Sequence, residues 1–290
     1  MGAWLHAIRL HHWSKNLVIF VPVVLAHEYS NRSKIFIVAI GFLVLGAVVS
    51  ASYIGNDLAD LEVDRKHRSK RARPFASGRL STRAGIAAAV LMLIGGLGAG
   101  LFLPRPSFIL LCAYLALTIG YTLWFKRVAL FDAAAISMMF TLRVALGAVV
   151  IASGQSVWLL SFSWAFFLSL ALAKRHGELM QFVEQGGGPI PGRGFHSDDW
   201  PLTISFGVGA GVASIVIMLL YLANDAAPTG FYPDRGWLYV APATVLIWLM
   251  RVWLLSHRAK LHDDPVEFAL KDPVSITLGI IVATAFVLAL

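Results

Sequence analysis

Charged side chains are scarce in this sequence. Only 14% of its 290 residues are Asp, Glu, Lys or Arg, and 58% are hydrophobic, whereas a soluble domain has about 25% charged residues. Cysteine is almost absent as well, because Cys112 is the single one, and this excludes an internal disulfide framework. The first residues lack the basic-then-apolar order of a cleavable signal peptide, so we expect none. These absences favour an integral membrane protein, almost all of it within the membrane.

Long apolar runs are what the sequence has instead. Nine of them approach the length of roughly 17 to 25 residues that a transmembrane helix needs, although the first is short and contains Pro22. We expect the sixth to continue beyond the membrane as a polar helix to about residue 185. The nine runs cover 16–29, 34–54, 82–103, 107–125, 129–152, 156–174, 201–223, 236–256 and 273–290. The sequence therefore predicts an all-α membrane protein whose residues 1–290 form a single domain.

Basic residues predict how the chain is oriented in the membrane. With the N-terminus inside, only four of the 24 Lys and Arg residues fall in outer loops: Arg32, Lys34, Arg105 and Arg235. The positive-inside rule then places the N-terminus in the cytoplasm and the C-terminus outside. The net charge of +8 is explained by this distribution and does not indicate nucleic-acid binding. We expect a bacterial plasma-membrane protein whose polar segments, 53–81 and 173–200, lie on the cytoplasmic face.

Acidic residues gather in the first of these segments. Asp57, Asp60 and Asp64 share one face of a helix, and Asn56 joins them through its spacing to Asp60. Acids at a membrane boundary are costly and are generally functional. A solvated helix end would be the alternative. Carboxylate and amide oxygens are ligands that suit Mg²⁺, so we interpret these four residues as metal ligands.

A basic cluster follows the acidic residues at once. Lys and Arg in a cytoplasmic loop are the ordinary topology signal and also meet anionic lipid, and for Arg65, Lys66 and Arg68 this explanation is as good as a functional one. The next three cations precede a predicted turn at Pro74 and Gly78, and we expect them to contact phosphate, Arg71 and Arg73 in particular. They are Lys70, Arg71 and Arg73. Acids that hold Mg²⁺ beside cations that hold phosphate make a site for a diphosphate ester.

A second polar stretch follows the sixth apolar run. Lys174 and Glu178 share a helix face, and Arg175 lies beside them. The stretch is either an ordinary salt bridge at a helix end or a second wall of the site, with the cations on phosphate and Glu178 on a metal or a sugar hydroxyl. The Gly- and Pro-rich residues 185–200 come next and predict a flexible linker or a lid.

Other polar residues are more scattered. Arg143 lies inside the fifth run, where a charge must face a cavity or a partner. We expect it to bind an anion or to pair with Asp132 or Glu178. Further candidates for substrate binding are Lys15, Asn16, Tyr121 and Lys126, although Lys15 could equally be an interfacial anchor. No His or Cys spacing matches a zinc site, and no nucleophile–base pair is visible.

The acidic and basic motifs resemble a known family. Asn56-Asp57-x-x-Asp60-x-x-x-Asp64, followed by Lys70-Arg71-x-Arg73-Pro74, is similar to the first aspartate-rich motif of the UbiA superfamily of membrane prenyltransferases. The second motif differs, because Lys174-Arg175-x-x-Glu178 stands where typical members carry two aspartates. That pattern resembles the branch that contains decaprenyl-phosphate phosphoribosyltransferase, a cell-wall enzyme. Asp132, Gly192-Arg193-Gly194-Phe195 and Asp263-Asp264-Pro265 also resemble this branch.

The resemblance implies a fold and an activity. Its fold is a set of nine helices around a central cavity that is open to the membrane. Its activity would be Mg²⁺-dependent transfer of 5-phosphoribose from phosphoribosyl diphosphate to a polyprenyl phosphate. The catalytic residues would be Asp57, Asp60, Asp64, Arg71 and Glu178, and Lys126, Arg143, Lys174 and Arg175 would bind phosphate.

Two alternatives stay open. One is an ordinary prenyltransferase that moves an isoprenyl group from its diphosphate to an aromatic or other acceptor, with the same metal site. The other is a transporter or lipid-binding protein, which would have charges along both halves of the membrane. The sequence does not decide the donor, the oligomeric state or the acceptor chain length.

Overall fold

The computed structural model describes the chain except residues 1, 67–69, 155, 191, 227–229 and 262–263. The described part is helical apart from one isolated β-bridge between Pro189 and His196. Seven helical segments are long and apolar enough to cross a membrane, and an eighth is reached if two helices bent by 82° count as one span. The seven are Arg32–Ala59, Thr82–Gly100, Arg105–Arg127, Phe131–Val150, Val157–Glu184, Ser197–Ala226 and Arg235–His257.

The expected count of nine spanning helices is not confirmed. Instead of one helix over 16–29, the chain forms the 3₁₀ helix η1 (Leu10–Phe20) and the short helix α2 (Val21–Leu25). Pro22 lies at the start of α2, where its missing N–H is tolerated, and it prevents a continuous α-helix through this stretch. The last run, 273–290, forms α12 (Pro273–Ala289), and the short helix α11 (Pro265–Lys271) precedes it across the bend.

The residues group into two compact units. Unit 1 comprises Met1–Thr122 and Leu142–Gly154, and unit 2 comprises Leu123–Thr141 and Gln155–Leu290. The helix α7 (Phe131–Val150) contributes its first half to unit 2 and its second half to unit 1.

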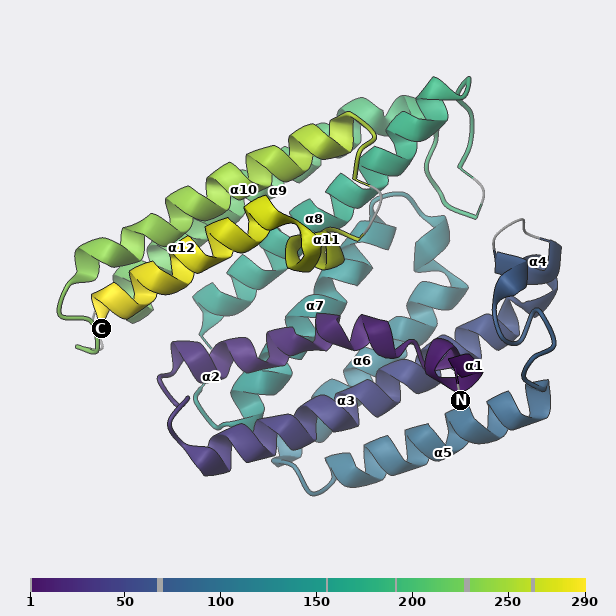
Figure 1. Ribbon diagram of the computed structural model, residues 1–290, viewed down its shortest axis with the longest axis horizontal. Helices are drawn as coiled ribbons and strands as arrows, with labels where there is room; N and C mark the ends of the chain where they lie inside the picture. Colours follow the sequence, from purple (N-terminus) through teal and green to yellow (C-terminus); the bar gives the residue numbers. More distant parts are fainter. Residues whose placement is uncertain (1, 67–69, 155, 191, 227–229, 262–263) are drawn as a thin grey trace. The chain divides into compact units, whose positions relative to one another are not determined.

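Unit 1 is built around the long helix α3 (Arg32–Ala59). Its uniformly apolar middle explains why it is half buried and carries most of the unit's core. The helix α5 (Thr82–Gly100) lies along it (Figure 1), and Gly96 permits this approach because a Cβ there would press on Val48 and on Ala47. The other elements of unit 1 are α1 (Gly2–Ala7), α4 (Leu61–Lys66), η2 (Lys70–Ala72) and α6 (Arg105–Leu123).

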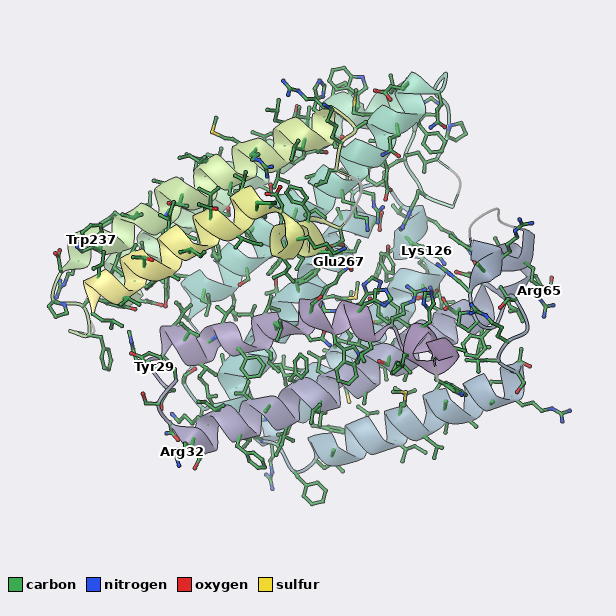
Figure 2. The ribbon with its side chains drawn as sticks, viewed as in Figure 1. Tyr29, Arg32, Arg65, Lys126, Trp237 and Glu267 are labelled. Atoms are coloured by element: carbon green, nitrogen blue, oxygen red, sulfur yellow. The ribbon has the colours of Figure 1, made fainter. Side chains whose placement is uncertain are left out.

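Polar residues separate to the two ends of α3. Figure 2 shows Tyr29 and Arg32 near its first residue and Arg65 beyond its last, on α4. The N-terminal end is capped by Asn31, whose side chain accepts a hydrogen bond from the Lys34 N–H. The acidic motif begins only in the last turn of the helix, so the fold keeps it away from the apolar centre of the span.

Unit 2 is built around α8 (Val157–Glu184), which packs along α9 (Trp200–Tyr221). The expected continuation of this helix to about residue 185 is confirmed, because α8 ends at Glu184. The helix α10 (Val240–His257) contacts α8, α9 and α12 (Figure 1). The remaining elements of the unit are η3 (Phe125–Arg127), η4 (Ser197–Asp199), η5 (Leu222–Ala226) and η7 (Arg235–Tyr239).

Candidate functional site

The acidic motif spans a break between two helices of unit 1. The prediction of one continuous helix face is wrong, because α3 ends at Ala59 and α4 begins at Leu61. Asp60 occupies the break, with backbone angles φ −92° and ψ 10°. The hydrogen bonds nevertheless continue across it, from the Asp60 N–H to the Asn56 carbonyl and from the Asp64 N–H to the Asp60 carbonyl. The acids therefore stay close although the helix does not.

One guanidinium group joins two of the acids. Nη1 of Arg73 donates to Oδ1 of Asp57 at 3.1 Å and to Oδ2 of Asp64 at 2.6 Å. Both carboxylates are almost fully buried, with side chains 3% and 2% exposed. Such charges are stable away from water only when they are paired and hydrogen-bonded. Arg73 therefore belongs to the acidic cluster, and its expected contact with phosphate stays a prediction.

The position of Arg73 is fixed by the next aromatic residue. Phe75 is buried with Ala7 and Ile54, so it anchors the segment on the core of unit 1. Gly85 makes room for the ring, because a Cβ there would lie 2.6 Å from Cε1 of Phe75. The turn predicted at Gly78 is present, with φ +74°, a conformation that favours glycine.

A second guanidinium group reaches the same acid. Nη2 of Arg9, from the N-terminal segment, lies 2.6 Å from Oδ1 of Asp57. Arg9 adopts left-handed backbone angles just before η1, and its guanidinium also lies 4.6 Å from the ring centroid of Tyr53. A non-glycine residue in this conformation is strained and persists where its surroundings hold it. The two arginines and two aspartates form one buried ionic cluster.

The oxygen atoms of this cluster suit a divalent cation. Asn56 contributes a buried Oδ1 that has no hydrogen-bond partner in the described part of the chain. Within that part, no group of three or more His, Cys, Asp or Glu residues is gathered closely enough to hold a metal ion. Mg²⁺ is nevertheless commonly held by one or two carboxylates, with waters and substrate phosphates completing its shell. The residues fit this mode, with Asp57, Asp64 and Asn56 as the protein ligands and half-buried Asp60 beside them.

The other motif cations are more accessible. Lys70 and Arg71 lie on η2 with exposed side chains. Arg65 is exposed on α4 and points away from it (Figure 2). Arg68 lies outside the described residues. Exposure is what a contact with a free substrate phosphate requires, and the contact stays a prediction.

Arg143 lies in a buried polar group inside unit 1. Its Nε donates to Oδ1 of Asn16 at 3.0 Å, and its Nη2 donates to the hydroxyl of Tyr114 at 2.7 Å. Asn16 is fully buried, and its Nδ2 has no hydrogen-bond partner in the described part of the chain. Lys15 is half-buried beside it. Asp132 and Glu178, the acids expected to pair with Arg143, both pair with Arg175, and their pairing with Arg143 stays a prediction.

Unit 2 holds a second ionic cluster around Asp132. This residue is completely buried and is the second residue of α7. Nε of Arg175 lies 2.6 Å from its Oδ2, and Nη1 of Arg193 donates to its Oδ1 at 3.2 Å. Arg175 also donates to Glu178 from Nη1 at 2.5 Å. Asp132 is therefore the centre of the cluster.

The remaining candidates lie around these clusters. Nζ of Lys174 is 3.6 Å from Oδ2 of Asp264, on the segment before α11. Asp263 lies outside the described residues. Lys126 is half-buried on η3, and Tyr121 is half-buried near the end of α6. The pairs of Lys174 and Arg175 agree with the simple helix-end explanation, and phosphate binding by these residues stays a prediction.

The Gly- and Pro-rich segment is ordered against unit 2. Ile190 and Phe195 are buried with Leu179 of α8, and the Ile190 N–H donates to the Phe195 carbonyl at 2.9 Å. Gly194 lies so close to η3 that a Cβ would overlap the Arg127 carbonyl. Of the two expectations for this segment, a flexible linker disagrees with this packing. A lid over a site stays a prediction.

Sequence reasoning missed several residues of these clusters. Neither Arg9, in the N-terminal segment, nor Tyr114, in an apolar run, belongs to a sequence motif. The resemblance named Arg193 without a role. The left-handed backbone of Arg9 and its pairing across 48 residues cannot be read from local spacing.

A family model matches most of the sequence. The model described as the UbiA prenyltransferase family matches residues 17–271, which is most of the chain. The protein belongs to the UbiA prenyltransferase family. The family is an enzyme class of the membrane, so the resemblance inferred from the aspartate-rich motif is confirmed at this level.

Three relatives of this UbiA protein differ in what their names say. It is 48% identical to the uncharacterized protein y4nM of Sinorhizobium fredii, over 99% of this chain and 56% of that protein. It is 31% identical to the nodulation protein NoeC of Azorhizobium caulinodans, over 97% of this chain and 92% of NoeC. Decaprenyl-phosphate phosphoribosyltransferase of Mycolicibacterium smegmatis is 27% identical, with 92% of this chain and 86% of that protein covered. The chain thus spans about half the length of y4nM.

A solved structure supports the fold. A UbiA homologue from Archaeoglobus fulgidus, bound to DMAPP and Mg²⁺, superposes with a TM-score of 0.72. The match covers 99% of this chain and 98% of that chain at 13% sequence identity. At this identity the likeness concerns the fold alone, and it confirms an all-helical UbiA fold.

Proposed function

We propose that this UbiA protein transfers 5-phosphoribose from phosphoribosyl diphosphate to a polyprenyl phosphate, with release of diphosphate. The observation that carries the proposal is the ionic cluster at Asp57, where carboxylates suited to a cation lie beside guanidinium groups suited to phosphate. The similarity to decaprenyl-phosphate phosphoribosyltransferase supports the choice of donor and acceptor.

The proposed reaction exchanges one C–O bond for another. The bond between ribose C1 and the diphosphate oxygen breaks, and that oxygen keeps the electron pair. An oxygen of the acceptor phosphate forms the new bond to C1. The acceptor is already an anion at neutral pH, so the reaction needs no general base. This agrees with the absence of a nucleophile–base pair from the two motifs.

The chemistry of each residue in the first cluster suggests its role in the proposed reaction. Bound Mg²⁺ would neutralise the negative charge that builds on the leaving diphosphate. Asp57, Asp64 and Asn56 would hold the ion, with Asp60 beside them. Arg73 would donate to the diphosphate, and exposed Arg71 would add a further donor. Arg9 would keep the buried charge of Asp57 compensated when Arg73 turns toward substrate.

Residues of the second cluster would bind the sugar and the phosphate monoesters. Glu178, about one-third exposed, can accept hydrogen bonds from ribose hydroxyls or help to hold a second metal ion. Lys174 and Lys126 are half-buried cations suited to a phosphate monoester. Arg175 is buried behind Glu178 and would mainly orient it, because their side chains are already paired.

Isoprenyl transfer to an aromatic or other acceptor is the second candidate. Family membership favours it, and so does the A. fulgidus homologue with its DMAPP. The same acidic cluster would serve, since both donors are diphosphate esters. The two candidates differ in the donor and the acceptor.

The deciding experiment supplies labelled donor to the purified protein in detergent. With Mg²⁺ and a polyprenyl phosphate, labelled phosphoribosyl diphosphate is expected to give lipid-extractable label. Omission of the acceptor should abolish it. No lipid-extractable label, together with turnover of a prenyl diphosphate on an aromatic acid, would replace the first candidate by the second.

A further inference from the structure

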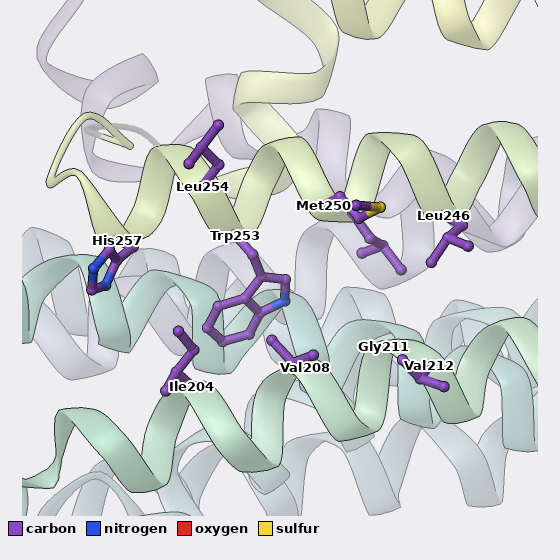
Figure 3. Close-up of a pocket in the computed structure, with 10 residues that line it drawn as sticks. Ile204, Val208, Gly211, Val212, Leu246, Met250, Trp253, Leu254 and His257 are labelled. Atoms are coloured by element: carbon purple, nitrogen blue, oxygen red, sulfur yellow. The ribbon is translucent and has the colours of Figure 1, made fainter.

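An apolar groove runs between α9 and α10 of unit 2 (Figure 3). It has a volume of about 360 Å³, and its walls are formed by aliphatic side chains, among them Val208, Val212 and Met250. These three side chains are exposed, so the groove opens outward along two membrane-spanning helices. Its contents must therefore be apolar.

The floor of the groove is fixed by one tryptophan. Trp253 is 6% exposed, and its Nε1 donates to the hydroxyl of Ser169 at 3.0 Å. Its ring lies against Gly207, where a Cβ would overlap it. The indole N–H is hydrogen-bonded and the ring packs on glycine, so the groove has a preformed shape. This reduces the conformational entropy lost when an apolar ligand binds there.

The groove ends at His257 (Figure 3). A chain of hydrogen bonds fixes the position of its ring. The Thr203 hydroxyl donates to the Trp200 carbonyl, so it accepts from Nδ1 of His176 at 3.0 Å. Nε2 of His176 then accepts from Nδ1 of His257 at 3.1 Å. This order of donors leaves Nε2 of His257 as a hydrogen-bond acceptor, which suits a hydroxyl group of a ligand. His176 is fully buried, so the support is part of the core.

Two cations follow this end of the groove in the sequence. Arg258 and Lys260 follow His257 with exposed side chains. Of the two acids before α9, Asp199 accepts from the His196 N–H and Asp198 accepts from the Ser197 hydroxyl. The first turn of α9 also begins here and favours an anion.

We propose that this groove is a binding site for an anionic membrane phospholipid. One acyl chain lies in the groove over Trp253, the phosphate contacts Arg258, and a headgroup hydroxyl donates to Nε2 of His257. The charge complementarity at the polar end and the apolar walls select a lipid with an anionic headgroup over a neutral one. The site consists of unit 2 residues outside the two ionic clusters, so it does not depend on the proposed reaction.

Fluorescence quenching tests the site directly. The full chain in detergent is titrated with phosphatidylglycerol brominated on its acyl chains, and with brominated phosphatidylcholine. Saturable quenching is expected for phosphatidylglycerol at lower concentration, and the Trp253→Phe variant should lack this component among the nine tryptophans. Arg258→Gln should raise the half-saturating concentration of phosphatidylglycerol about fivefold and leave that of phosphatidylcholine unchanged.

Two matched substitutions to phenylalanine distinguish binding in the groove from binding to the rest of the lipid-facing surface. Val212→Phe fills the groove, whereas Ile247→Phe adds the same ring at an exposed position of α10 outside its lining. Only Val212→Phe should remove saturable quenching. Equal quenching by both lipids, or no effect of Val212→Phe, would overturn the proposal. It would also be overturned if a polyprenyl phosphate, but not unlabelled phosphatidylglycerol, reversed the quenching.

Discussion

Arg9 and Asp57 are 48 residues apart in the sequence and form an ion pair of 2.6 Å. The pair joins the N-terminal segment to the last turn of α3. Asp57 is buried and Arg9 is 18% exposed, so the contact is largely shielded from water. Its geometry makes Arg9 part of the acidic cluster, a place that its position in the sequence does not suggest.

Replacement of Arg9 should weaken the cluster. Arg9→Gln leaves Asp57 with Arg73 as its cationic partner, and loss of a hydrogen bond to a buried charge costs about 1.5–3 kcal/mol. The thermal unfolding midpoint in detergent should fall, and Arg9→Lys should restore part of it. An unchanged midpoint in Arg9→Gln would show that the pair contributes nothing to stability.

Asp60 should matter for turnover more than for folding. It is half-exposed at the helix break, so Asp60→Asn should reduce transferase activity about 100-fold or more while the unfolding midpoint stays near that of the parent protein. Glu62→Gln is the matched control, because Glu62 is exposed on α4. Retained activity in Asp60→Asn would contradict a role for Asp60 at the metal site.

Asp132 should be the most destabilising single acid to remove in unit 2. Asp132→Asn leaves Arg175 buried with only part of its charge compensated, which costs about 3–5 kcal/mol when a buried pair is broken. Replacing both residues, as in Asp132→Leu with Arg175→Met, should recover much of that loss. Unfolding midpoints of Asp132→Leu, Arg175→Met and the double variant measure the coupling, and additive losses would argue against it.

The segment 185–200 should loosen when its ion pair is removed. Arg193→Gln breaks the contact with Asp132, so hydrogen exchange in this segment should become faster. Arg127→Gln provides the control, since Arg127 is exposed on η3. Equal exchange in both variants would mean that the packing of Ile190 and Phe195 alone holds the segment.

Much of the architecture could be predicted because it depends on local composition. The long apolar runs become α3 and α5 to α10, and α8 continues to Glu184 as its polar end predicts. The first run became η1 and α2, because the run is short and Pro22 interrupts it. The orientation of the N-terminus and the single-domain interpretation remain predictions.

The site was predictable in its residue types and only partly in its contacts. Acids spaced at helical intervals do converge, since Asp57 and Asp64 share Arg73. The break at Asp60 was not foreseen, because no proline or glycine marks it. The partners of Arg143 and Asp132 depend on which helices meet, and spacing along one helix does not contain that information.

The central claim concerns the donor, and one measurement tests it most directly. The purified protein is given Mg²⁺, phosphoribosyl diphosphate, a prenyl diphosphate, a polyprenyl phosphate and an aromatic acid together, and the lipid products are analysed by mass spectrometry. We predict a polyprenyl phosphate that carries one phosphoribosyl group. An unmodified polyprenyl phosphate beside a prenylated aromatic acid would contradict the proposed function.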